Sequence, residues 1–429
     1  MVVQHNMQAA NANRMLNVTT SAQSKSTEKL SSGYRINRAA DDAAGLTISE
    51  KMRKQIRGLD QASTNAQDGV SSVQTAEGAL TEVHSMLQRM NELATQAANG
   101  TNSESDRSSI QDEIDQLTTE IDRVSETTKF NETYLLKGQS GTTNKYMAAH
   151  DAGFDGTLVD GDTKATFTMK IKAGESLKIG GTNYDIYATG SGVSDLQDKV
   201  GKLTANQEVT IDGTKYTVVD KAGVDEKANK LEATTIAAKI QAGSTVNLTP
   251  ADASKAVKAV DTSKPTSIDV ATATQKVTAE LQAANDIGAA DGKSTVTAGT
   301  ATADGTIEFA IQKGHASVAN TLSFNLHVGA DADSTNKITV NIDSMSTAGL
   351  GIKGLNVKDS TGTAATYAID AIADAISTVS SQRSSLGAVQ NRLEHTINNL
   401  DNVSENTTSA ESRIRDTDMA TEMVEYSKN

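Results

Sequence analysis

The sequence predicts a multi-domain protein with an all-α, coiled-coil-like helical bundle core formed by both chain ends, a small β-hairpin on that core, and an inserted α+β outer domain. Three observations lead to this fold class. Apolar residues recur with a helical period near both ends of the chain. Between about 140 and 350, apolar and polar side chains alternate instead, which is typical of strands. Both prolines, Pro250 and Pro265, lie in this middle part, so the helical ends contain none.

The longest predicted helix follows an apolar stripe near the start of the chain. Its residues recur at a mean spacing of about 3.5, the period of a coiled-coil seam, and a helix of this length would rise roughly 75 Å. Gly58, Gly69 and Gly78 lie within it and cost about 1 kcal/mol each relative to alanine. They mark either the close approach of another element or tolerated defects. The stripe consists of Ile48, Met52, Ile56, Leu59, Ala62, Ala66, Val70, Val73, Ala76, Leu80, Val83, Leu87, Met90, Ala94 and Ala97.

Two further stripes predict the partners of this helix. Apolar residues continue at helical spacing over 369–403, and a shorter stripe covers 110–124. Each stripe lies on one side of its helix and has to be buried against another helix, where a large aliphatic side chain contributes about 1.5–3 kcal/mol. The simplest arrangement is one bundle in which the two chain ends meet. Ser103 and Asp106 have capping-box spacing ahead of the shorter helix.

Residues 1–45 are polar and rich in Ala, Asn, Ser and Thr, with only a thin helical stripe. Such a segment alone buries too little apolar surface to offset the entropy lost on ordering. We therefore expect it to be disordered in a free monomer and ordered only against neighbouring molecules.

The middle of the chain predicts half-buried antiparallel strands and an internal repeat. Ile179-Gly-Gly-Thr-Asn-Tyr184 matches Ile211-Asp-Gly-Thr-Lys-Tyr216, and in each copy a glycine stands where a tight hairpin turn needs positive φ. A helical stretch follows each copy, so the unit is read as β-β-α, with further helical pieces around 225–242 and 268–286. The strand residues are Phe167, Met169 and Ile171; Ile307, Phe309 and Ile311; Leu322, Phe324, Leu326 and Val328; and Ile338, Val340 and Ile342.

These patterns give predicted domain bounds. They are an N-terminal inner helix segment at 1–45, the N-terminal core helices at 46–139, the variable outer α+β domain at 140–320, a core hairpin and connection at 321–360, the C-terminal core helix at 361–411, and the start of a C-terminal inner segment at 412–429.

Composition argues against several classes of function. The formal net charge of −14 argues against nucleic acid as a partner, and no apolar run of about 18 residues predicts a membrane span. There is no cysteine, so thiol nucleophiles, disulfides and thiolate metal sites are impossible. The N-terminus lacks the basic and apolar regions of a usual secretory signal.

Catalytic and metal sites are not predicted either. The six histidines lie far apart in sequence and form no His-Glu-x-x-His pattern, and there is no Gly-x-Ser-x-Gly elbow. We expect no catalytic residue, no metal and no cofactor. The alternatives kept open are a hydrolytic site in the 140–320 insert and a binding module such as an adhesin or receptor ligand.

Three long motifs, in the same order, resemble bacterial flagellins. Residues 28–50 read EKLSSGYRINRAADDAAGLTISE and resemble the N-terminal signature of that family. Residues 68–80, DGVSSVQTAEGAL, are similar to its next block, and residues 412–423, SRIRDTDMATEM, are similar to its closing signature. The resemblance covers about 1–138 and 321–429.

The resemblance implies a structural subunit of the flagellar filament, used for swimming motility. Its implied partners are other copies of itself, a flagellar export chaperone and the filament cap. Type III export would bring it to the extracellular flagellum without a secretory signal, and its terminal segments would fold on assembly. The residues implied in self-assembly are Met7, Leu16, Leu30, Arg35, Ile36, Asp41, Asp42, Arg413, Arg415, Asp416 and Asp418.

The mixed-charge cluster among these residues has two readings. Arg413, Arg415, Asp416 and Asp418 could form i,i+3 pairs worth a few tenths of a kcal/mol on a helix surface, or ion pairs between subunits. The family also continues past Asn429 with a terminal helix rich in Ala, Gln and Leu. A chain that ends there lacks half of the inner packing partner, so we do not expect this form to polymerise by itself.

The resemblance further implies recognition by the vertebrate Toll-like receptor 5. Arg89, Leu93 and Glu113 match the family pattern, whereas Asn91 and Leu117 stand where strong agonists have arginine. Leu93 could instead pack in the bundle, and Arg89 could be merely exposed or dock a neighbouring subunit. The residues implied in receptor binding are Arg89, Met90, Glu92, Leu93, Gln96 and Glu113.

Overall fold

The computed structural model describes residues 6–188, 191–249, 256–259, 264–302, 304–359 and 361–428. Pro250 lies outside these ranges. The chain divides into two compact units, one formed by Met1–Gly78, Leu322–Ile342 and Gln382–Asn429, the other by Ala79–Thr321 and Asp343–Ser381. Each unit is described by itself below. The domain bounds inferred from the sequence are drawn differently and stay a prediction.

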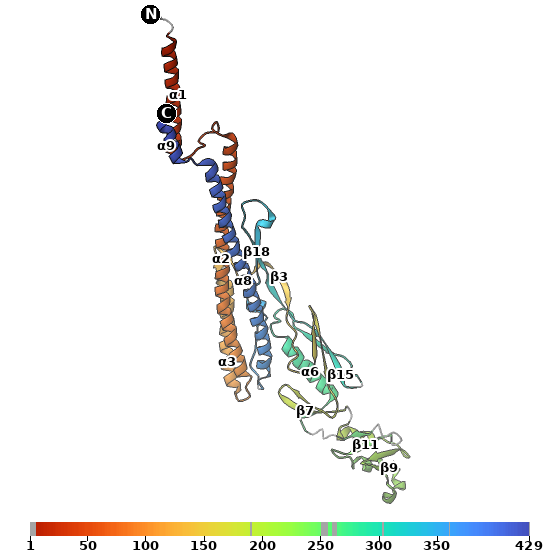
Figure 1. Ribbon diagram of the computed structural model, residues 1–429. Coiled ribbons are helices and arrows are strands. Elements are labelled where there is room, and N and C mark those ends of the chain that lie inside the picture. The colour runs from red at the N-terminus through yellow and green to blue at the C-terminus, as the bar shows by residue number, and fades with distance from the viewer. Residues whose placement is uncertain are drawn as a thin grey trace. The chain divides into compact units, whose positions relative to one another are not determined.

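Long helices form at both chain ends (Figure 1), as the apolar stripes predict. The stripe over 48–97 lies in a single unbroken helix, and so does the stripe over 369–403. The helices of the chain ends are α1 (Met7–Ser32), α2 (Ala43–Ala97), α3 (Glu104–Thr127), α8 (Thr363–Arg415) and α9 (Met419–Lys428). No helix in the described ranges is long and apolar enough to cross a membrane.

In the first unit, a β-hairpin packs on α2 and α8. Strands β17 (Leu322–His327) and β18 (Lys337–Ile342) pair antiparallel, and alternate residues of β18 are buried. Ala66 of α2, Leu393 of α8 and Ile338 of the hairpin share one apolar cluster. The amide of Asn65 donates to the carbonyl of His327 at 3.0 Å, so side-chain hydrogen bonds also fix the hairpin. The predicted core hairpin is therefore present.

The glycines of α2 differ in what surrounds them. A Cβ added at Gly69 would lie 2.3 Å from Leu326 Cδ1 and 3.3 Å from Leu393 Cδ1, and one at Gly58 would lie 3.0 Å from the Cβ of Ala330. Nothing lies within 4 Å of the corresponding point at Gly78. Gly69 and Gly58 thus allow close approach of the hairpin segment, whereas Gly78 is a tolerated defect.

In the second unit, the end of α2, all of α3 and the start of α8 bury their apolar stripes. Leu87 of α2, Ile114 of α3 and Ile372 of α8 have no solvent exposure. The N-terminus of α3 has the predicted capping box, because the Ser103 hydroxyl accepts from the Asp106 amide and the Asp106 carboxylate accepts from the Ser103 amide. Two backbone N–H groups at the start of α3 that have no acceptor within the helix are therefore hydrogen-bonded.

Two polar side chains of α3 hold the irregular segment that precedes α8. The Gln111 amide donates to the Leu355 carbonyl at 2.9 Å and accepts from the Val357 amide at 2.7 Å. Asp122 accepts from both the amide and the hydroxyl of Thr347, each at 2.8 Å, at the start of α7 (Thr347–Leu350). Buried backbone groups of this irregular segment therefore have partners, as burial requires.

Asp359 caps the start of α8. Partial burial by itself would raise the pKa of this carboxyl, but hydrogen bonds from the Thr361 hydroxyl and the amides of Ala364, Gly362 and Thr363 outweigh it and lower the pKa below its usual 3.8. The charged Asp359 carboxylate is therefore more stable in the folded chain than in the unfolded chain, so it stabilises the fold at neutral pH.

We expect Asp359→Ala to lower the free energy of unfolding at neutral pH by about 1 kcal/mol, as for other N-cap losses. Because the folded pKa is the lower one, the difference from the unsubstituted protein should shrink as the pH falls below 3.8 and the carboxylate is protonated. Thermal unfolding of both proteins at neutral and acidic pH measures this. A difference that grows on acidification would contradict the assigned sign.

The outer part of the second unit contains an antiparallel sheet and a smaller mixed sheet, with one helix packed against them (Figure 1). The larger sheet has the strand order β14 (Thr295–Ala298), β15 (Thr306–Gln312), β5 (Lys164–Lys170), β4 (Thr157–Asp160). A smaller one has the order β13 (Ser267–Asp269), β7 (Thr182–Tyr187), β6 (Ser176–Ile179). Helix α6 (Val270–Asn285) shares their core, through Val277 and Leu281 against Phe167 and Phe309. The predicted helical piece at 268–286 is therefore α6.

Shorter ladders complete this unit. Strand β3 (Gln139–Tyr146) pairs with β16 (His315–Asn320), and β1 (Lys129–Phe130) pairs with β2 (Thr133–Tyr134). The amide of Met345 donates to the carbonyl of Leu136, shortly after β2, at 2.9 Å.

Both copies of the sequence repeat form the predicted hairpins. Gly180 and Gly181 have positive φ between β6 and β7, and Asp212 and Gly213 have positive φ between β8 (Glu208–Ile211) and β9 (Thr214–Val218). Two consecutive residues with positive φ are typical of a type I′ hairpin turn. The first copy is followed by α4 (Val193–Gly201), which completes a β-β-α unit.

The helix predicted around 225–242 is wrong in extent. This stretch holds short 3-10 turns η1 (Lys221–Gly223) and η2 (Glu226–Ala228), strand β10 (Lys230–Leu231) and only the short helix α5 (Ala233–Ala237). Asn229 ends η2 in the left-handed conformation, and Leu231 then pairs in parallel with Val218. The described sheet has the order β10-β9-β8-β11-β12, with β11 at Thr245–Asn247 and β12 at Val257–Lys258.

Candidate interaction surfaces

The two chain ends meet in the first unit at the loop after α1. The amide of Arg35 donates to the carbonyl of Arg415 at 2.7 Å, and the amide of Thr417 donates to the Gly33 carbonyl at 3.0 Å. Gly33 has φ +75°, the left-handed conformation in which α1 ends. The loop between α1 and α2 is therefore hydrogen-bonded to the end of α8.

Arg415 is the central side chain of this junction. Its guanidinium forms an ion pair with Glu50 of α2 at 3.0 Å and lies 4.8 Å from the ring centroid of Tyr34. The Arg35 guanidinium donates to the Ile414 carbonyl. Two of the arginines implied in self-assembly are thus bonded within the subunit, and we read their first role as fixing the α1–α2 loop on α8.

The carboxylates of the same set also have partners in their own subunit. Asp41 accepts from the amides of Arg38 and Asn37 and lies 3.3 Å from Lys25, and these hydrogen bonds lower its pKa, that from Arg38 most. Asp42 accepts from the Gly45 amide at 2.8 Å, in the first turn of α2. Local capping explains both aspartates of the EKLSSGYRINRAADD motif.

The closing signature behaves in the same way. Asp416 accepts from the Ser412 hydroxyl at 2.6 Å, and Asp418 accepts from the amides of Ala420 and Thr421 at the start of α9, which lowers its pKa. Arg413 is exposed and forms no ion pair among the residues that the structure describes. No i,i+3 ion pair joins members of this cluster among the described residues, because Arg415, Asp416 and Asp418 have other partners within the subunit. Pairing between subunits stays a prediction.

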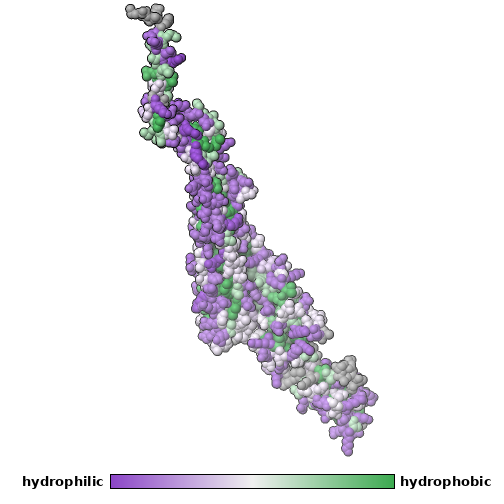
Figure 2. All heavy atoms as spheres, in the orientation of Figure 1, coloured by the Kyte–Doolittle hydropathy of each residue, from purple (hydrophilic) through white to green (hydrophobic). Residues whose placement is uncertain are grey.

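Helices α1 and α9 carry apolar side chains that the subunit does not bury. Met7 is 74% exposed and Leu16 is 63% exposed, and Ser26 is the buried residue of α1. Figure 2 shows green, hydrophobic atoms at the surface of the helix that follows the grey N-terminal residues. Leu30 is half-buried and Ile36 is buried. The exposed apolar residues of the two helices are Met7, Met15, Leu16, Val18, Met419, Met423, Val424 and Tyr426.

A second candidate surface lies in the other unit, where α2 and α3 run side by side. Arg89 of α2 donates to Glu113 of α3 at 2.9 Å and to Glu92 at 3.1 Å, and these carboxylates raise its pKa, Glu113 most. About half of the Arg89 and Glu113 side chains is exposed, and Gln96 is exposed one turn further along. Four of the six residues implied in receptor binding, namely Arg89, Glu92, Gln96 and Glu113, thus lie on one surface.

Met90 and Leu93 do not belong to that surface. Their exposed fractions are 0% and 2%, because they point into the helical bundle with the seam residues Leu87 and Ala94. The prediction that a receptor contacts them is corrected here: their side chains pack in the core. Packing was one of the two readings open for Leu93, and Met90 is itself a member of the predicted apolar stripe.

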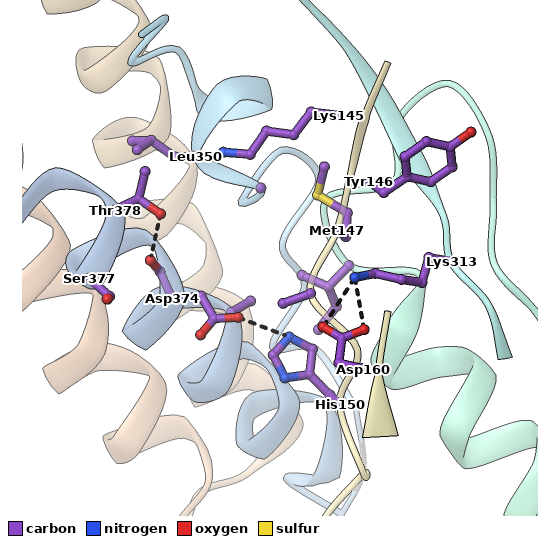
Figure 3. Close-up of a pocket in the computed structure, with 14 residues that line it drawn as sticks. Lys145, Tyr146, Met147, His150, Asp160, Lys313, Leu350, Asp374, Ser377 and Thr378 are labelled. Carbon is purple, nitrogen blue, oxygen red and sulfur yellow. Dashed lines mark hydrogen bonds and ion pairs between the residues drawn. The ribbon is translucent and has the colours of Figure 1, made fainter. Parts of the chain in front are cut away.

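The cavity drawn in Figure 3 has a volume of about 380 Å³ and lies in the second unit. Lys313 lies 2.9 Å from Asp160, His150 lies 3.6 Å from Asp374, and Lys145 donates to the Gly349 carbonyl. The Asn285 amide fixes His150 by accepting from its backbone N–H and donating to its backbone carbonyl. In the described ranges no group of three His, Asp or Glu side chains could hold a metal. The His150–Asp374 contact thus joins the segment after β3 to α8, and the Lys313–Asp160 pair joins the end of β4 to the residue after β15.

A buried arginine is the functional feature that sequence reasoning missed. Arg107 is 2% exposed and donates to the carbonyls of Ala97, Asn99 and Asp359. Its guanidinium therefore links the end of α2, the α2–α3 turn and the segment before α8. Its partners are backbone carbonyls, one of them 252 residues away, so no sequence motif marks it.

The fold and these surfaces define a helical structural protein whose terminal helices keep apolar side chains available for further protein contacts. Comparisons with known proteins agree. Residues 3–141 match the bacterial flagellin N-terminal helical region, and residues 369–429 match the bacterial flagellin C-terminal helical region. A flagellin of Clostridium tyrobutyricum is 42% identical over all of this chain and 95% of its own length. One of Bacillus subtilis strain 168 is 36% identical over all of this chain and 91% of its own length.

The chain belongs to the bacterial flagellin family, and it is a filament subunit, not an enzyme. Among solved structures, FliC from Burkholderia pseudomallei is 21% identical and matches 76% of this chain and 99% of its own, with a TM-score of 0.27. Membership in the family rests on the sequence comparisons.

Proposed function

We propose that this flagellin assembles into its filament through the helices of its two chain ends, and that the extracellular filament drives swimming. Export by the type III route, with an export chaperone and the filament cap as partners, belongs to the same proposal. The supporting observation is the set of exposed apolar side chains on α1 and α9. Self-association is the way in which identical chains cover such side chains without a second protein.

The spacing on α1 favours partners on more than one side. At 3.6 residues per turn, Met7, Met15 and Val18 lie within about a quarter of the helix circumference, whereas Leu16 lies on another side. One neighbouring helix would cover only one of these two sides of α1. A polymer surrounds each inner helix with several copies, so it covers both.

Burial of these side chains also supports folding on assembly. Each apolar side chain removed from water contributes about 1.5–3 kcal/mol, whereas ordering the backbone costs about 1–2 kcal/mol per residue. A lone α1 with one buried residue cannot offset that cost. We therefore propose that α1 (Met7–Ser32) is disordered in the free monomer and becomes helical against neighbours, whereas the loop that follows it is hydrogen-bonded to the end of α8.

The matched variants Val18→Asp and Asn17→Asp test the assembly surface. Both add one negative charge at adjacent exposed positions of α1, but only Val18 is apolar. Each is expressed from the full gene in a bacterium whose own flagellin gene is deleted, and filaments are counted by electron microscopy. We expect Val18→Asp to lose filaments and Asn17→Asp to keep them. Equal filament numbers for both, or none from the unsubstituted gene, would contradict the proposal.

Receptor recognition is the second candidate function, and the α2–α3 surface favours it. Arg89 holds Glu92 and Glu113 in one exposed cluster, so a guanidinium and two carboxylates are presented to a partner in fixed positions. Preorganised arginines are frequent centres of binding energy at interfaces. We propose Arg89, Glu92, Gln96 and Glu113 as the contact set for Toll-like receptor 5.

We expect Arg89→Ala to weaken binding to the purified receptor ectodomain by about tenfold or more, as for a central interface arginine. Arg123→Ala is the control, because Arg123 is also exposed and pairs with Glu120 three residues away on α3. It removes the same charge outside the proposed set. Surface plasmon resonance with the unpolymerised chain measures both affinities. If the two variants bind alike, the surface is assigned wrongly.

A further inference from the structure

One asparagine of this chain is followed directly by glycine, at Asn99-Gly100 in the turn between α2 and α3. Backbone amides can attack the carboxamide of the preceding asparagine, and a side chain on the attacking residue hinders this approach. Glycine has none. The dipeptide is therefore the place in the sequence where such an attack meets the least steric resistance.

The structure leaves the reacting groups of this dipeptide accessible. Asn99 and Gly100 are both exposed, and no heavy atom lies within 4 Å of the point where a Cβ of Gly100 would stand. The Gly100 amide donates no hydrogen bond to any residue in the described ranges. The attacking nitrogen is thus not held by another acceptor.

The next amide stabilises the charge that the attack creates. The backbone N–H of Thr101 donates to Asn99 Oδ1 at 3.2 Å. When the Gly100 nitrogen adds to Asn99 Cγ, negative charge develops on that same oxygen. A donor already placed there lowers the barrier, as in an oxyanion hole.

The neighbouring Asn102-Ser103 shows the opposite arrangement. The Ser103 amide, which would be the attacking nitrogen, donates to Asp106 Oδ2 at 3.0 Å in the capping box of α3. The carboxamide nitrogen of Asn102 donates to the Gln96 carbonyl. Both reacting groups are engaged, so we expect Asn102 to be stable although it lies three residues from Asn99.

We propose that Asn99 is a site of spontaneous deamidation in this flagellin. The Gly100 nitrogen loses its proton and forms a bond to Asn99 Cγ, the Cγ–Nδ2 bond breaks, and ammonia leaves, which closes a five-membered imide. Water then opens the imide. Attack at Cγ breaks the Cγ bond to the Gly100 nitrogen and gives aspartate, whereas attack at the main-chain carbonyl carbon breaks the bond from that carbon to the same nitrogen and gives isoaspartate with a free α-carboxylate.

Arg107 directs the second step toward isoaspartate. Its Nη2 lies 3.3 Å from the main-chain oxygen of Asn99, so it polarises the carbonyl at which water must attack to give isoaspartate. The α-carboxylate formed there faces a guanidinium whose acceptors are otherwise backbone carbonyls. A charge-assisted pair replaces a neutral hydrogen bond and stabilises the product.

The test incubates the whole protein in mildly alkaline buffer and follows the peptide that contains residue 99 by mass spectrometry, with enzymatic methylation to detect isoaspartate. We expect conversion at Asn99 before any other asparagine, and an isoaspartate share above that of the synthetic peptide spanning 97–103. Conversion at Asn102 first, or an unreacted Asn99, would overturn the proposal. An isoaspartate share equal to that of the peptide would overturn the part assigned to Arg107.

Gly100→Ala is the matched variant. The φ of Gly100 lies outside the left-handed range and its surroundings are open, so alanine should fit without strain and leave thermal unfolding unchanged. We expect the deamidated peptide to be lost over the same incubation, because the methyl group hinders the attacking nitrogen. Conversion at an unchanged rate in a folded Gly100→Ala protein would rule out the imide route.

Discussion

Replacing Arg107 by methionine should lower the free energy of unfolding of the second unit by about 3 kcal/mol or more, because three backbone carbonyls lose a charged donor. Methionine keeps much of the side-chain volume but cannot donate a hydrogen bond. The carbonyl of Ala97, which accepts from Arg107 Nε at 2.8 Å, is buried and would lose this hydrogen bond. An unsatisfied buried carbonyl costs about 1–3 kcal/mol by itself.

Hydrogen exchange gives the local readout for this change. We expect faster exchange of the amides at the end of α2 and at the start of α8, where Ala97 and Asp359 are held together. Arg123→Met is the control, because Arg123 is exposed on α3 and pairs with Glu120, three residues away on the same helix. Exposed pairs of this kind contribute little. Similar exchange in both variants would show that the Arg107 contacts do not stabilise this junction.

The helical part of the fold could be predicted because its signal is periodic. The stripe with Leu80 and Leu87 and the stripe with Ile372 each need a partner helix, since one side of each helix is apolar over many turns. The hairpin turns were equally readable, because Gly181 and Gly213 supply the positive φ that such turns require. In both cases the physical demand is local in sequence.

The parts that failed depend on contacts between distant residues. The piece around 225–242 has helix-forming composition, but Leu231 is taken by parallel pairing with Val218, which limits α5 to a few residues. Arg107 was not found because its acceptors carry no side-chain signal. Tertiary pairing of this kind overrides local propensity.

The candidate surfaces show the limit of transferring positions from a family. Met90 was placed on the receptor surface by resemblance, although its place in the apolar stripe already indicated burial. The apolar stripe predicts the burial of Met90 better than the family resemblance does, because a residue in the stripe faces the neighbouring helix of the bundle. For Arg415 and Asp418, helix capping and ion pairing within the subunit account for motif residues that the resemblance assigns to assembly.

Phe309→Ala should destabilise the outer sheet core of the second unit by about 3–5 kcal/mol, the usual range for removing a buried phenylalanine. Phe309 has no solvent exposure. It stands directly opposite Phe167 in the β15–β5 ladder, with 6.4 Å between the ring centroids. The substitution removes apolar burial and this aromatic contact together, and it leaves a cavity between the sheet and α6.

Val159→Ala on β4 is the control for this prediction, because Val159 is 62% exposed and its loss creates no cavity. The chain has no tryptophan, so we would follow exchange of the β5 and β15 amides instead of intrinsic tryptophan fluorescence. Phe309→Leu should cost less than Phe309→Ala, since most of the volume is kept. The effect should also stay local, with α2 and α3 amides unchanged, because their core contains none of these aromatic residues. Equal exchange rates in Phe309→Ala and Val159→Ala would contradict a sheet core centred on the two phenylalanines.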